Sequence, residues 1–449
     1  MEMNVFTYTT AALFTFVVLF QFSYIIVTFR YSRKPKALKQ IHPEDTISIL
    51  IPAYNEAAVI ESCLKGVLAL NYTNYETIFI NDGSDDYTLE RLIDLLDAER
   101  TVINPSGSLI YAKVHEVYRS KKYPNIYIID KENGGKANSL NAGIAYATGN
   151  IMITLDADSI LQHDSLIYVN QEFNNPDVIA AGGMVQVGQM YNKAGKPVFK
   201  GNPILKYQLS DYLMSFYVRR FAQSKMKMIA IVSGAFGVFR RDVLHDIGGY
   251  KKTLGEDMEI TLNIQTYIRV KRKQAKLIFI PEAVCFTEVP ENLRDVYKQR
   301  IRWQKGFVDC IVKYRKSFFR TLSVGFTLFL FWDAIIMAVL GILTIILLPI
   351  LIIADLFTIY HLILMGVSVV LQFVFRVTTY WSATRYSHNY RWFEYVRLIL
   401  FFIIELPFRP LLDMSFYLFG TFSYVFEKDK HNWNKVKRLG NVEITKKSA

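Results

Sequence analysis

The sequence has few of the residues on which disulfide frameworks and metal clusters depend. Cysteine occurs only three times in 449 residues, as Cys63, Cys285 and Cys310, at a wide spacing that is typical of neither arrangement. The seven histidines are scattered without the spacing of metal ligands, so we assign them structural roles. There is also no internal repeat and no low-complexity tract. These absences exclude a disulfide framework and a repeat architecture, and they predict reduced thiols in a cytosolic domain.

Apolar and basic residues are what the sequence has in excess. The hydrophobic fraction of 51% and the mean hydropathy of +0.17 are high for a soluble protein, and the excess is concentrated at the two ends of the chain. The formal charge of +12 would suit a nucleic-acid partner. Much of the basic excess lies beside apolar segments, however, so anionic lipid headgroups explain it more simply. We expect a large soluble domain with membrane segments, membrane lipids as partners and no nucleic acid.

The first apolar segment predicts a permanent membrane anchor. Residues 5–29 are uncharged and long enough to cross a bilayer, and five basic residues follow at once between Arg30 and Lys39. A cleaved signal would carry its positive charge before the apolar run instead. We therefore expect an anchor at residues 1–29, a basic linker at 30–45, and the following domain in the cytoplasm.

The carboxyl-terminal third has three further apolar stretches, at about residues 324–353, 359–375 and 398–426. The loop expected before the last stretch carries Arg376, Arg385, Arg391 and Arg397, which predicts a cytoplasmic position. Pro407, Arg409 and Pro410 interrupt the last stretch, so it is either a single crossing or a re-entrant or interfacial segment. The basic tail at 427–449 favours the second choice, but the sequence leaves both open.

Between about residues 46 and 316, predicted strands alternate with predicted helices. We expect strands at 46–52, 76–80, 126–130, 151–155 and 178–182. We expect helices at 57–70, 88–99, 165–173 and 258–270, and two more that begin at residues 137 and 293. This alternation is typical of an α/β sheet covered by helices. Each polar cluster follows a predicted strand, so the clusters can converge at the edge where ligands bind such sheets. We assign residues 46–292 to a catalytic domain, 293–322 to interfacial helices and 323–426 to a membrane or re-entrant region.

Two carboxylates follow the fourth predicted strand. Asp156 and Asp158 are separated by one residue, so they point to the same face if the extended geometry persists. Adjacent carboxylates repel each other unless a cation lies between or beside them, and hard divalent cations bound to phosphates prefer such ligands. Alone, the pair would more often be a polar turn after a strand.

Six motifs, taken in order, resemble those of family 2 glycosyltransferases, the inverting GT-A class. They are Pro52-Ala-Tyr-Asn-Glu56 with Asp82-Gly-Ser-Asp85, Asn133-Gly-Gly-Lys136, Asp156-Ala-Asp158, Ser233-Gly-Ala235, Gly255-Glu-Asp257 and Gln299-Arg-Ile-Arg302-Trp303. The fifth has Gly255 where the family has threonine. The last resembles the Gln-x-x-Arg-Trp signature of membrane-embedded processive synthases, which make cellulose, chitin, hyaluronan and poly-N-acetylglucosamine.

The resemblance implies a role for each matching residue. Asp257, with Glu256 beside it, is expected to be the catalytic base. The donor is expected to contact Tyr54, Glu56, Asp82, Lys136, Asp156 and Arg302. The acceptor or product is expected to contact Ser233, Gly234, Gln299 and Trp303, and Mg²⁺ or Mn²⁺ is expected on Asp158 and Asp156. Without the resemblance, Glu256 and Asp257 would be ordinary charges in a first helical turn. The face shared by Gln299, Arg302 and Trp303 would then equally suit an interfacial helix.

The resemblance further implies a multi-pass enzyme of the bacterial plasma membrane with a GT-A domain in the cytoplasm. The chain is similar in layout to poly-β-1,6-N-acetylglucosamine synthases, so we expect a processive β-glycosyltransferase that extends a polysaccharide from a UDP-sugar, with UDP-N-acetylglucosamine as the first choice. Accessory export subunits would be compatible with this role. An alternative is single transfer to a lipid, which makes a glycolipid. A catalytically dead export component is disfavoured because every expected acidic position is filled.

Overall fold

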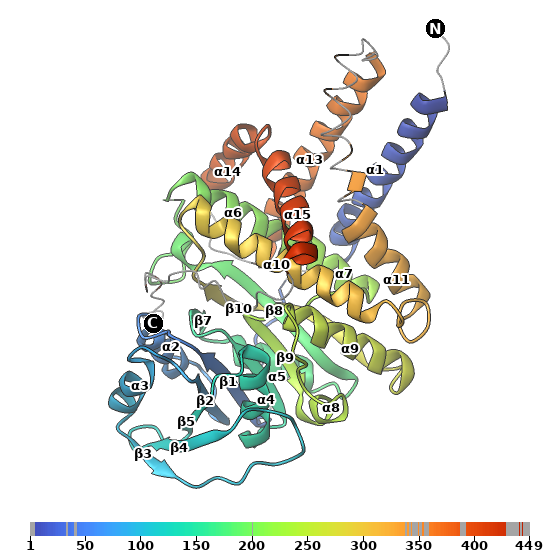
Figure 1. The fold of residues 1–449 in the computed structure, drawn as a ribbon. Helices are drawn as coiled ribbons and strands as arrows, with labels where there is room; N and C mark the ends of the chain where they lie inside the picture. Colours follow the sequence, from blue (N-terminus) through green and yellow to red (C-terminus); the bar gives the residue numbers. More distant parts are fainter. Residues whose placement is uncertain are drawn as a thin grey trace.

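The computed structural model describes residues 5–32, 35–39, 43–199, 201–336, 359–386 and 392–427, together with residues 339, 340, 343, 349, 353, 440 and 442. Within these residues the chain forms one α/β body from which two long helices, α1 (Val5–Tyr31) and α13 (Ile359–Tyr386), project (Figure 1).

One ten-stranded sheet forms the centre of the body, in the order β3-β4-β5-β2-β1-β6-β9-β8-β10-β7. The strands are β1 (Ile47–Ala53), β2 (Tyr75–Asp82), β3 (Ala98–Thr101), β4 (Val114–Ser120), β5 (Ile126–Lys131), β6 (Ile151–Leu155), β7 (Ser159–Leu161), β8 (Val178–Val187), β9 (Phe236–Arg240) and β10 (Lys276–Thr287). Strands β5, β2, β1 and β6 are parallel neighbours. Their carboxyl ends therefore lie at one edge, as the predicted α/β class requires.

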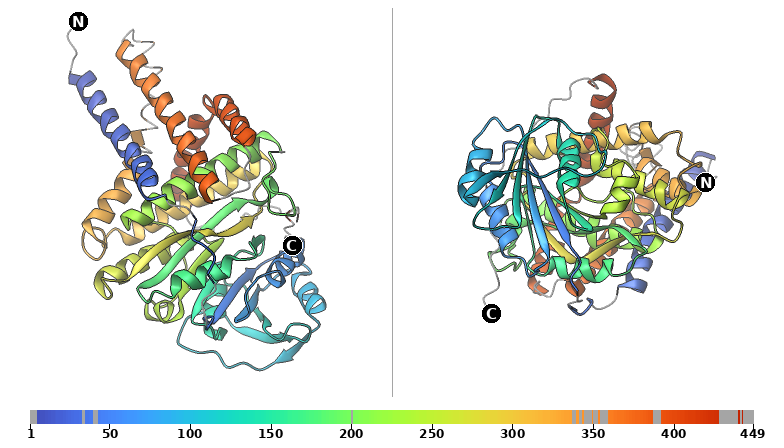
Figure 2. Two further views of the ribbon diagram at one scale, coloured as in Figure 1. Left: turned by 180° about the vertical axis from the view of Figure 1, so that it is seen from behind. Right: turned by 90° about the horizontal axis from the view of Figure 1, so that it is seen from below.

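Helices cover both faces of this sheet and extend beyond it (Figures 1 and 2). They are α1 (Val5–Tyr31), α2 (Ile60–Leu68), α3 (Thr88–Leu96), α4 (Lys136–Tyr146), α5 (Ser165–Phe173), α6 (Pro203–Met214), α7 (Phe221–Met226), α8 (Arg241–Asp246), α9 (Glu256–Val270), α10 (Leu293–Tyr314), α11 (Val324–Leu330), α13 (Ile359–Tyr386), α14 (Trp392–Glu405) and α15 (Arg409–Phe426). Strands β1 and β6 are almost fully buried because helices pack on both sides, which explains their uninterrupted apolar sequences.

The structure corrects one predicted element and adds others. The helix expected at 88–99 ends at Leu96, because Asp97 has a left-handed backbone with φ of 46°, and β3 begins at Ala98. Short antiparallel strands β3 and β4 were not predicted, since their mostly polar residues carry no clear alternation. The three cysteines are free and buried.

Among the described residues, α13 alone is long and apolar enough to cross a membrane. It runs beside α1, and both project away from the sheet (Figures 1 and 2). Their lower ends are joined by the rings of Phe29 and Trp381, 4.4 Å apart, and by a hydrogen bond from Arg385 to the carbonyl of Ser32 (2.6 Å). The predicted set of membrane segments is therefore matched by one clear candidate, and most of residues 337–358 lie outside the described residues.

The position of two arginines differs from the prediction. Arg376 and Arg385 were expected in a loop, but both lie within α13, which continues to Tyr386. Arg376 is buried and pairs with Ser210 on α6 and Glu405 on α14. The basic charge that seemed to mark a loop therefore compensates a buried carboxylate.

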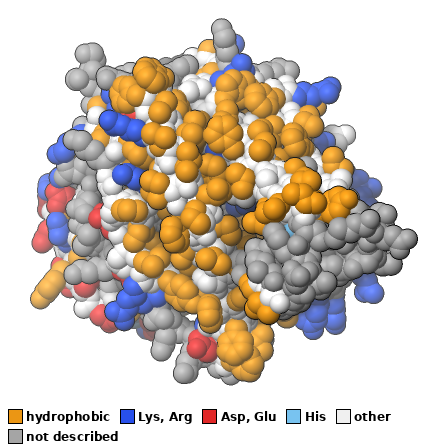
Figure 3. Space-filling model, turned by 90° about the horizontal axis from the view of Figure 1, so that it is seen from above, with side chains coloured by type: hydrophobic (Ala, Val, Ile, Leu, Met, Phe, Trp, Pro, Cys, Tyr) orange, Lys and Arg blue, Asp and Glu red, His pale blue; other side chains and the backbone are white. Residues whose placement is uncertain are grey.

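The last apolar stretch is two helices rather than one. Helices α14 and α15 are separated at residues 406–408, next to the predicted break at Pro407. Helix α15 packs along α10, burying Phe416, Gly420 and Tyr424, while Leu418 and Phe422 on its other side are exposed. Seen from this end, hydrophobic side chains cover much of the surface (Figure 3).

Two residues of the carboxyl-terminal tail contact the catalytic body. The Gly440 N–H donates to Glu288 Oε2 at 3.0 Å. Val442 is only 4% exposed and packs against Ile160 and Phe286. Gly440 and Val442 therefore lie on the same side of α15 as the sheet.

Candidate active site

Lys136 brings four sequence motifs together at the carboxyl edge of the sheet. It is the first residue of α4, and its Nζ lies 2.5 Å from Asp156 Oδ1, 3.4 Å from Glu256 Oε1 and 3.3 Å from the carbonyl oxygen of Gly234. These partners follow β6, precede β9 and begin α9. The predicted convergence on one crevice therefore takes the form of a single ammonium group among carboxylates.

The electrostatics of this cluster depend on burial. The pKa of Asp257 is raised to about 6, first by burial and then by the nearby Glu256 carboxylate, with Lys136 acting in the opposite direction. Burial acts to lower the pKa of Lys136, but Asp156 and Glu256 outweigh it and the pKa is raised overall. A carboxyl group with a pKa near neutrality and a fixed cation beside it is suited to accept a proton.

The start of α9 fixes the position of Asp257. Its Oδ1 accepts the Met258 N–H at 2.8 Å, and its carbonyl accepts the Thr261 hydroxyl at 2.6 Å. Thr261 Oγ1 in turn accepts the Val232 N–H at 2.9 Å, which ties α9 to the segment containing Ser233. A small cavity of about 10 Å³ lies there, lined in part by Lys136, Ser233, Gly234, Glu256 and Asp257. A methyl group on Gly234 would lie 2.8 Å from Lys136 Nζ, so a side chain at this position would displace the ammonium group.

Asp82 organises the glycine-rich loop. Its carboxylate pairs with buried Lys131 and accepts the N–H groups of Gly134 (3.0 Å) and Gly135 (2.8 Å). Gly135 has a φ of 86°, which favours glycine. Asp82 is thus buried and bound within the protein, next to the loop that leads into α4.

The Asp156–Asp158 pair has a different geometry from the one predicted. Strand β6 ends at Leu155, and the Ser159 N–H donates to the Asp156 carbonyl at 3.0 Å, so the two carboxylates lie in a turn instead of an extended segment. Asp156 faces Lys136, whereas Asp158 Oδ1 accepts the hydroxyls of Ser159 (3.2 Å) and Thr287 (3.3 Å). Both aspartates are partly exposed. Within the described residues, no group of three or more potential metal ligands is present.

The segment after β1 is held against the segment after β2. The Tyr54 hydroxyl donates to Asp85 Oδ2 at 2.9 Å, and Asn55 Oδ1 accepts the Asp85 N–H at 2.8 Å. Asn55 has a φ of 55°, a left-handed conformation that asparagine tolerates. The N–H of Glu56 donates to Thr88 at 2.8 Å. The two predicted donor motifs therefore form one surface.

Helix α10 presents its signature residues in different environments. Gln299 is 5% exposed, Arg302 is partly buried and Trp303 is 41% exposed. The guanidinium of Arg300 lies 4.4 Å from the centre of the Trp303 ring and 2.8 Å from Asp211 Oδ2 on α6. The sequence analysis did not identify Arg300 or Asp211 as site residues. An arginine near a tryptophan in the sequence does not reveal an ion pair with an aspartate 89 residues earlier in the chain.

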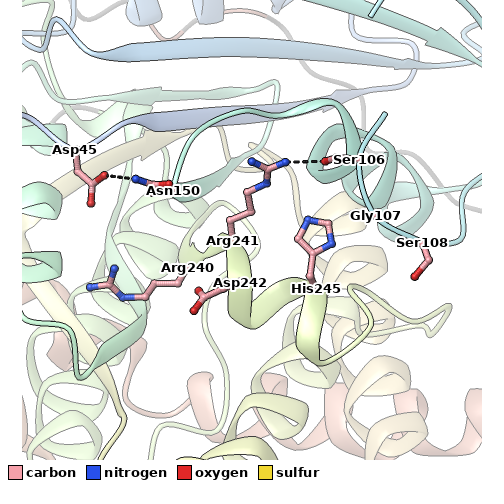
Figure 4. Close-up of a pocket in the computed structure, with 9 residues that line it drawn as sticks. All are labelled: Asp45, Ser106, Gly107, Ser108, Asn150, Arg240, Arg241, Asp242 and His245. Carbon is pink, nitrogen blue, oxygen red and sulfur yellow. Dashed lines mark hydrogen bonds between the residues drawn. The ribbon is translucent and has the colours of Figure 1, made fainter. Parts of the chain in front are cut away.

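A larger cavity lies elsewhere. It measures about 640 Å³ and is lined by Asp45, Ser106, Gly107, Ser108, Asn150, Arg240, Arg241, Asp242 and His245 (Figure 4). Asn150 precedes β6, so the cavity is at the opposite edge from Lys136. Arg240 donates to backbone carbonyls, including that of Val178 (2.7 Å), and Arg241 donates to Ser106 (2.6 Å). These side chains hold surface loops, and we assign the cavity no catalytic role.

Comparison with known proteins agrees with this arrangement. The family model described as glycosyl transferase family 2 matches residues 48–248, and the model described as glycosyl transferase family group 2 matches residues 151–377. A mannosyltransferase from Pyrobaculum calidifontis, solved in complex with GDP-Man and Mn²⁺, has a TM-score of 0.53 and 18% identity, covering 93% of this chain and 99% of that one. This likeness supports the fold, a mixed α/β sheet of the GT-A kind.

Two relatives are similar in sequence. Poly-beta-1,6-N-acetyl-D-glucosamine synthase of Staphylococcus aureus (strain COL) is 28% identical over 296 residues, which are 66% of this chain and 61% of that protein. The synthase of the same name from Staphylococcus epidermidis is 27% identical over 288 residues, 64% of this chain and 60% of its own length. The match thus spans less than two thirds of these relatives. With a family model covering half of its length and the motifs gathered at one sheet edge, the chain belongs to glycosyltransferase family 2.

Proposed function

We propose that this protein transfers a sugar from a nucleoside diphosphate to a growing polysaccharide, with inversion at the sugar carbon and Asp257 as the base. The observation that carries the proposal is the Lys136 cluster, which places Asp156, Gly234 and Glu256 within 3.4 Å of one ammonium group, directly beside Asp257. The requirements of packing alone do not explain why these charged groups from separate motifs lie together.

The reaction divides among these residues. In its ionised form, Asp257 accepts the proton of the acceptor hydroxyl as that oxygen bonds to the sugar carbon. The bond from this carbon to the diphosphate breaks, and the diphosphate leaves with the electron pair. Lys136, at the first turn of α4, is placed to bind the departing oxygens together with the free N–H groups there. Tyr54 and Glu56 are proposed to form the surface for the nucleoside, and buried Asp82 is proposed to support it by holding the Gly134–Gly135 loop.

Asp156 and Asp158 fit a divalent cation. The ion pair between Lys136 and Asp156 shows that a positive charge is stable next to this carboxylate. Both carboxylates are partly exposed and offer hard oxygen ligands. Mg²⁺ or Mn²⁺ is commonly held by one or two carboxylates plus substrate phosphates, so two protein ligands are sufficient. When bound, the ion would neutralise charge on the leaving diphosphate. Chelation by EDTA should abolish transfer reversibly, and activity that persists under full chelation would contradict this assignment.

The acceptor is proposed to lie along α10. Trp303 offers an exposed ring to a sugar, and Arg300 holds that ring from one side. Gln299 and Arg302 on the same helix are proposed to contact product and diphosphate. The similarity to two poly-β-1,6-N-acetylglucosamine synthases favours UDP-N-acetylglucosamine as donor and repeated transfer.

The enzyme is proposed to work at a membrane. Helix α13 can span a bilayer, α1 runs beside it, and exposed apolar side chains of α14 and α15 gather at the same end of the molecule (Figure 3). This arrangement supports a catalytic domain on the cytoplasmic side and passage of the product into the membrane region.

The deciding experiment combines donor turnover with product sizing. The purified, detergent-solubilised protein is incubated with a panel of UDP-sugars and Mg²⁺ or Mn²⁺, and released nucleotide and labelled product length are measured, with Asp257→Asn as the control. Long chains from UDP-N-acetylglucosamine support the proposal. Only singly or doubly glycosylated lipid at every donor concentration would establish the glycolipid alternative, and no turnover with any donor would refute both.

A further inference from the structure

The loop before Asp257 is held by helix α10. The N–H of Leu254 donates to Asp309 Oδ2 at 3.3 Å, the Cys310 thiol donates to the Gly255 carbonyl at 3.3 Å, and Lys313 Nζ donates to the Lys252 carbonyl at 2.7 Å. The backbone that leads into the catalytic pair is therefore bound along one face of α10.

A pair of glycines makes this approach possible. A methyl group on Gly255 would lie 3.0 Å from Cα of Gly306, and one on Gly306 would lie 2.9 Å from Cα of Gly255. The two backbones thus touch without side chains between them. This contact also explains why glycine occupies position 255, where a threonine side chain would push α10 away.

Asp309 connects this loop to a third element. Its Oδ1 accepts the hydroxyl of Tyr424 on α15 at 3.2 Å, while its Oδ2 holds Leu254. Asp309 is 8% exposed, and Lys313 Nζ lies 3.6 Å from Oδ2. One carboxylate therefore joins α15, whose outer side is apolar and exposed, to the loop that carries the proposed base.

We propose that Asp309 is a positioning residue that holds Asp257 in its reactive orientation. Through Asp309, the packing of α15 against α10 would also affect the geometry of the active site. This inference rests on the proposed role of Asp257 as base. The first turn of α9 has no side-chain cap, because Gly255 stands at the cap position. The contacts from α10 instead hold the backbone that enters this turn, and Asp309 supplies the one that is shared with α15.

The variants separate positioning from general stability. Asp309→Leu removes both acceptors, whereas Asp309→Asn keeps the shape and one acceptor. Tyr424→Phe removes only the contact from α15. Tyr297→Phe is the matched control, because Tyr297 lies on α10 with its ring 5.7 Å from that of Phe416 on α15, and phenylalanine would keep this ring contact.

Steady-state kinetics over a range of pH provide the readout. We expect kcat of Asp309→Leu to fall about 10- to 100-fold with KM for the donor changed less than about twofold, because misplacement affects chemistry more than donor binding. Water entering the loosened site should lower the pKa of Asp257 and move the acid limb of the profile to lower pH. Asp309→Asn should recover most of the rate, Tyr424→Phe should lose part of it, and Tyr297→Phe should match wild type.

Three results would overturn the inference. A folded Asp309→Leu protein with wild-type kcat and an unmoved acid limb would do so. So would a parallel loss of kcat, donor affinity and thermal stability with no change in the acid limb, since that indicates a structural role alone. If wild type transfers no sugar, the proposed function fails. Hydrogen exchange at the amides of residues 254–257 then tests whether Asp309 holds this loop in place. Faster exchange in Asp309→Leu supports it, and unchanged exchange rejects it.

Discussion

At the scale of single residues, Lys136 and Asp257 carry the proposed chemistry. The ammonium group contacts carboxylates from two motifs, while burial and Glu256 raise the pKa of Asp257 to about 6. A base whose pKa lies just below neutrality is mostly ionised at physiological pH and still accepts a proton readily. The positions of Asp156 and Glu256 around one cation keep these charges compatible in a partly buried site.

Replacing Asp257 by asparagine tests the base directly. Asp257→Asn keeps the shape and the oxygen that accepts the Met258 N–H, so the protein should fold and bind UDP normally. Transfer should fall about 10²- to 10⁴-fold, the usual contribution of a positioned base. Turnover and UDP affinity by calorimetry are the measurements, and retention of more than about a tenth of the wild-type rate would refute the role.

The pH dependence of kcat/KM reports the same group. Asp257 must be ionised to act, so the rate should rise with pH up to about 6 and fall about tenfold per pH unit below it. Glu256 is the second cause of the raised pKa, after burial. In Glu256→Gln, the acid limb of the residual activity should therefore move to lower pH. A limb at the same pH in both proteins would show that Asp257 is not the group observed.

At the scale of elements, close packing of α10 against the start of α9 is the feature that motif order could not reveal. The sequence predicted a helix from residue 293, and α10 begins at Leu293, because its apolar side chains recur at helical spacing and Asn292 caps it. The contact between Gly255 and Gly306 joins positions 51 residues apart in sequence. Only the tertiary structure brings these backbones together.

A methyl group at Gly306 should separate these elements. In Gly306→Ala the new carbon would lie 2.9 Å from Gly255 Cα and from the Leu254 carbonyl oxygen, and overpacking of this kind costs about 1–3 kcal/mol. We expect a lower unfolding temperature of the solubilised protein and reduced transfer.

Gly366→Ala is the matched control for this change. Gly366 lies within α13, and a methyl group there has no atom within 4 Å, while alanine favours a helix by about 1 kcal/mol. This variant should be at least as stable and as active as wild type. Equal losses in both variants would mean that the effect does not come from the α9–α10 contact.

At the scale of the whole molecule, the helices outside the sheet form the part that we propose to contact a membrane. Helices α1 and α13 project together, whereas α15 lies along α10 with one side exposed. The contacts of Gly440 with Glu288 and of Val442 with Phe286 place these two residues of the tail against the α/β body. A single crossing by residues 398–426 would put the tail on the other side, so this geometry favours the interfacial alternative.

Labelling in oriented membrane vesicles tests this topology. The native cysteines are all buried, so an introduced thiol can be read against a low background. Ser448→Cys in the tail and Ser108→Cys, at an exposed position of the catalytic body, should react with a membrane-impermeant maleimide from the same side. Reaction from opposite sides would show that the last apolar stretch crosses the bilayer.

The amino-acid sequence, through its resemblance to the family's motifs, indicated the residues that gather at the sheet edge, and by itself it determined the α/β class and the main strands and helices. These follow from local rules, because hydrophobic period sets the elements and parallel strands place their carboxyl ends together. The tertiary structure decided the turn that contains Asp156 and Asp158, the buried pairing of Arg376, and the contacts of Asp309 with Leu254 and Tyr424. Those depend on the distance and burial between segments remote in sequence, which no local pattern of residues encodes.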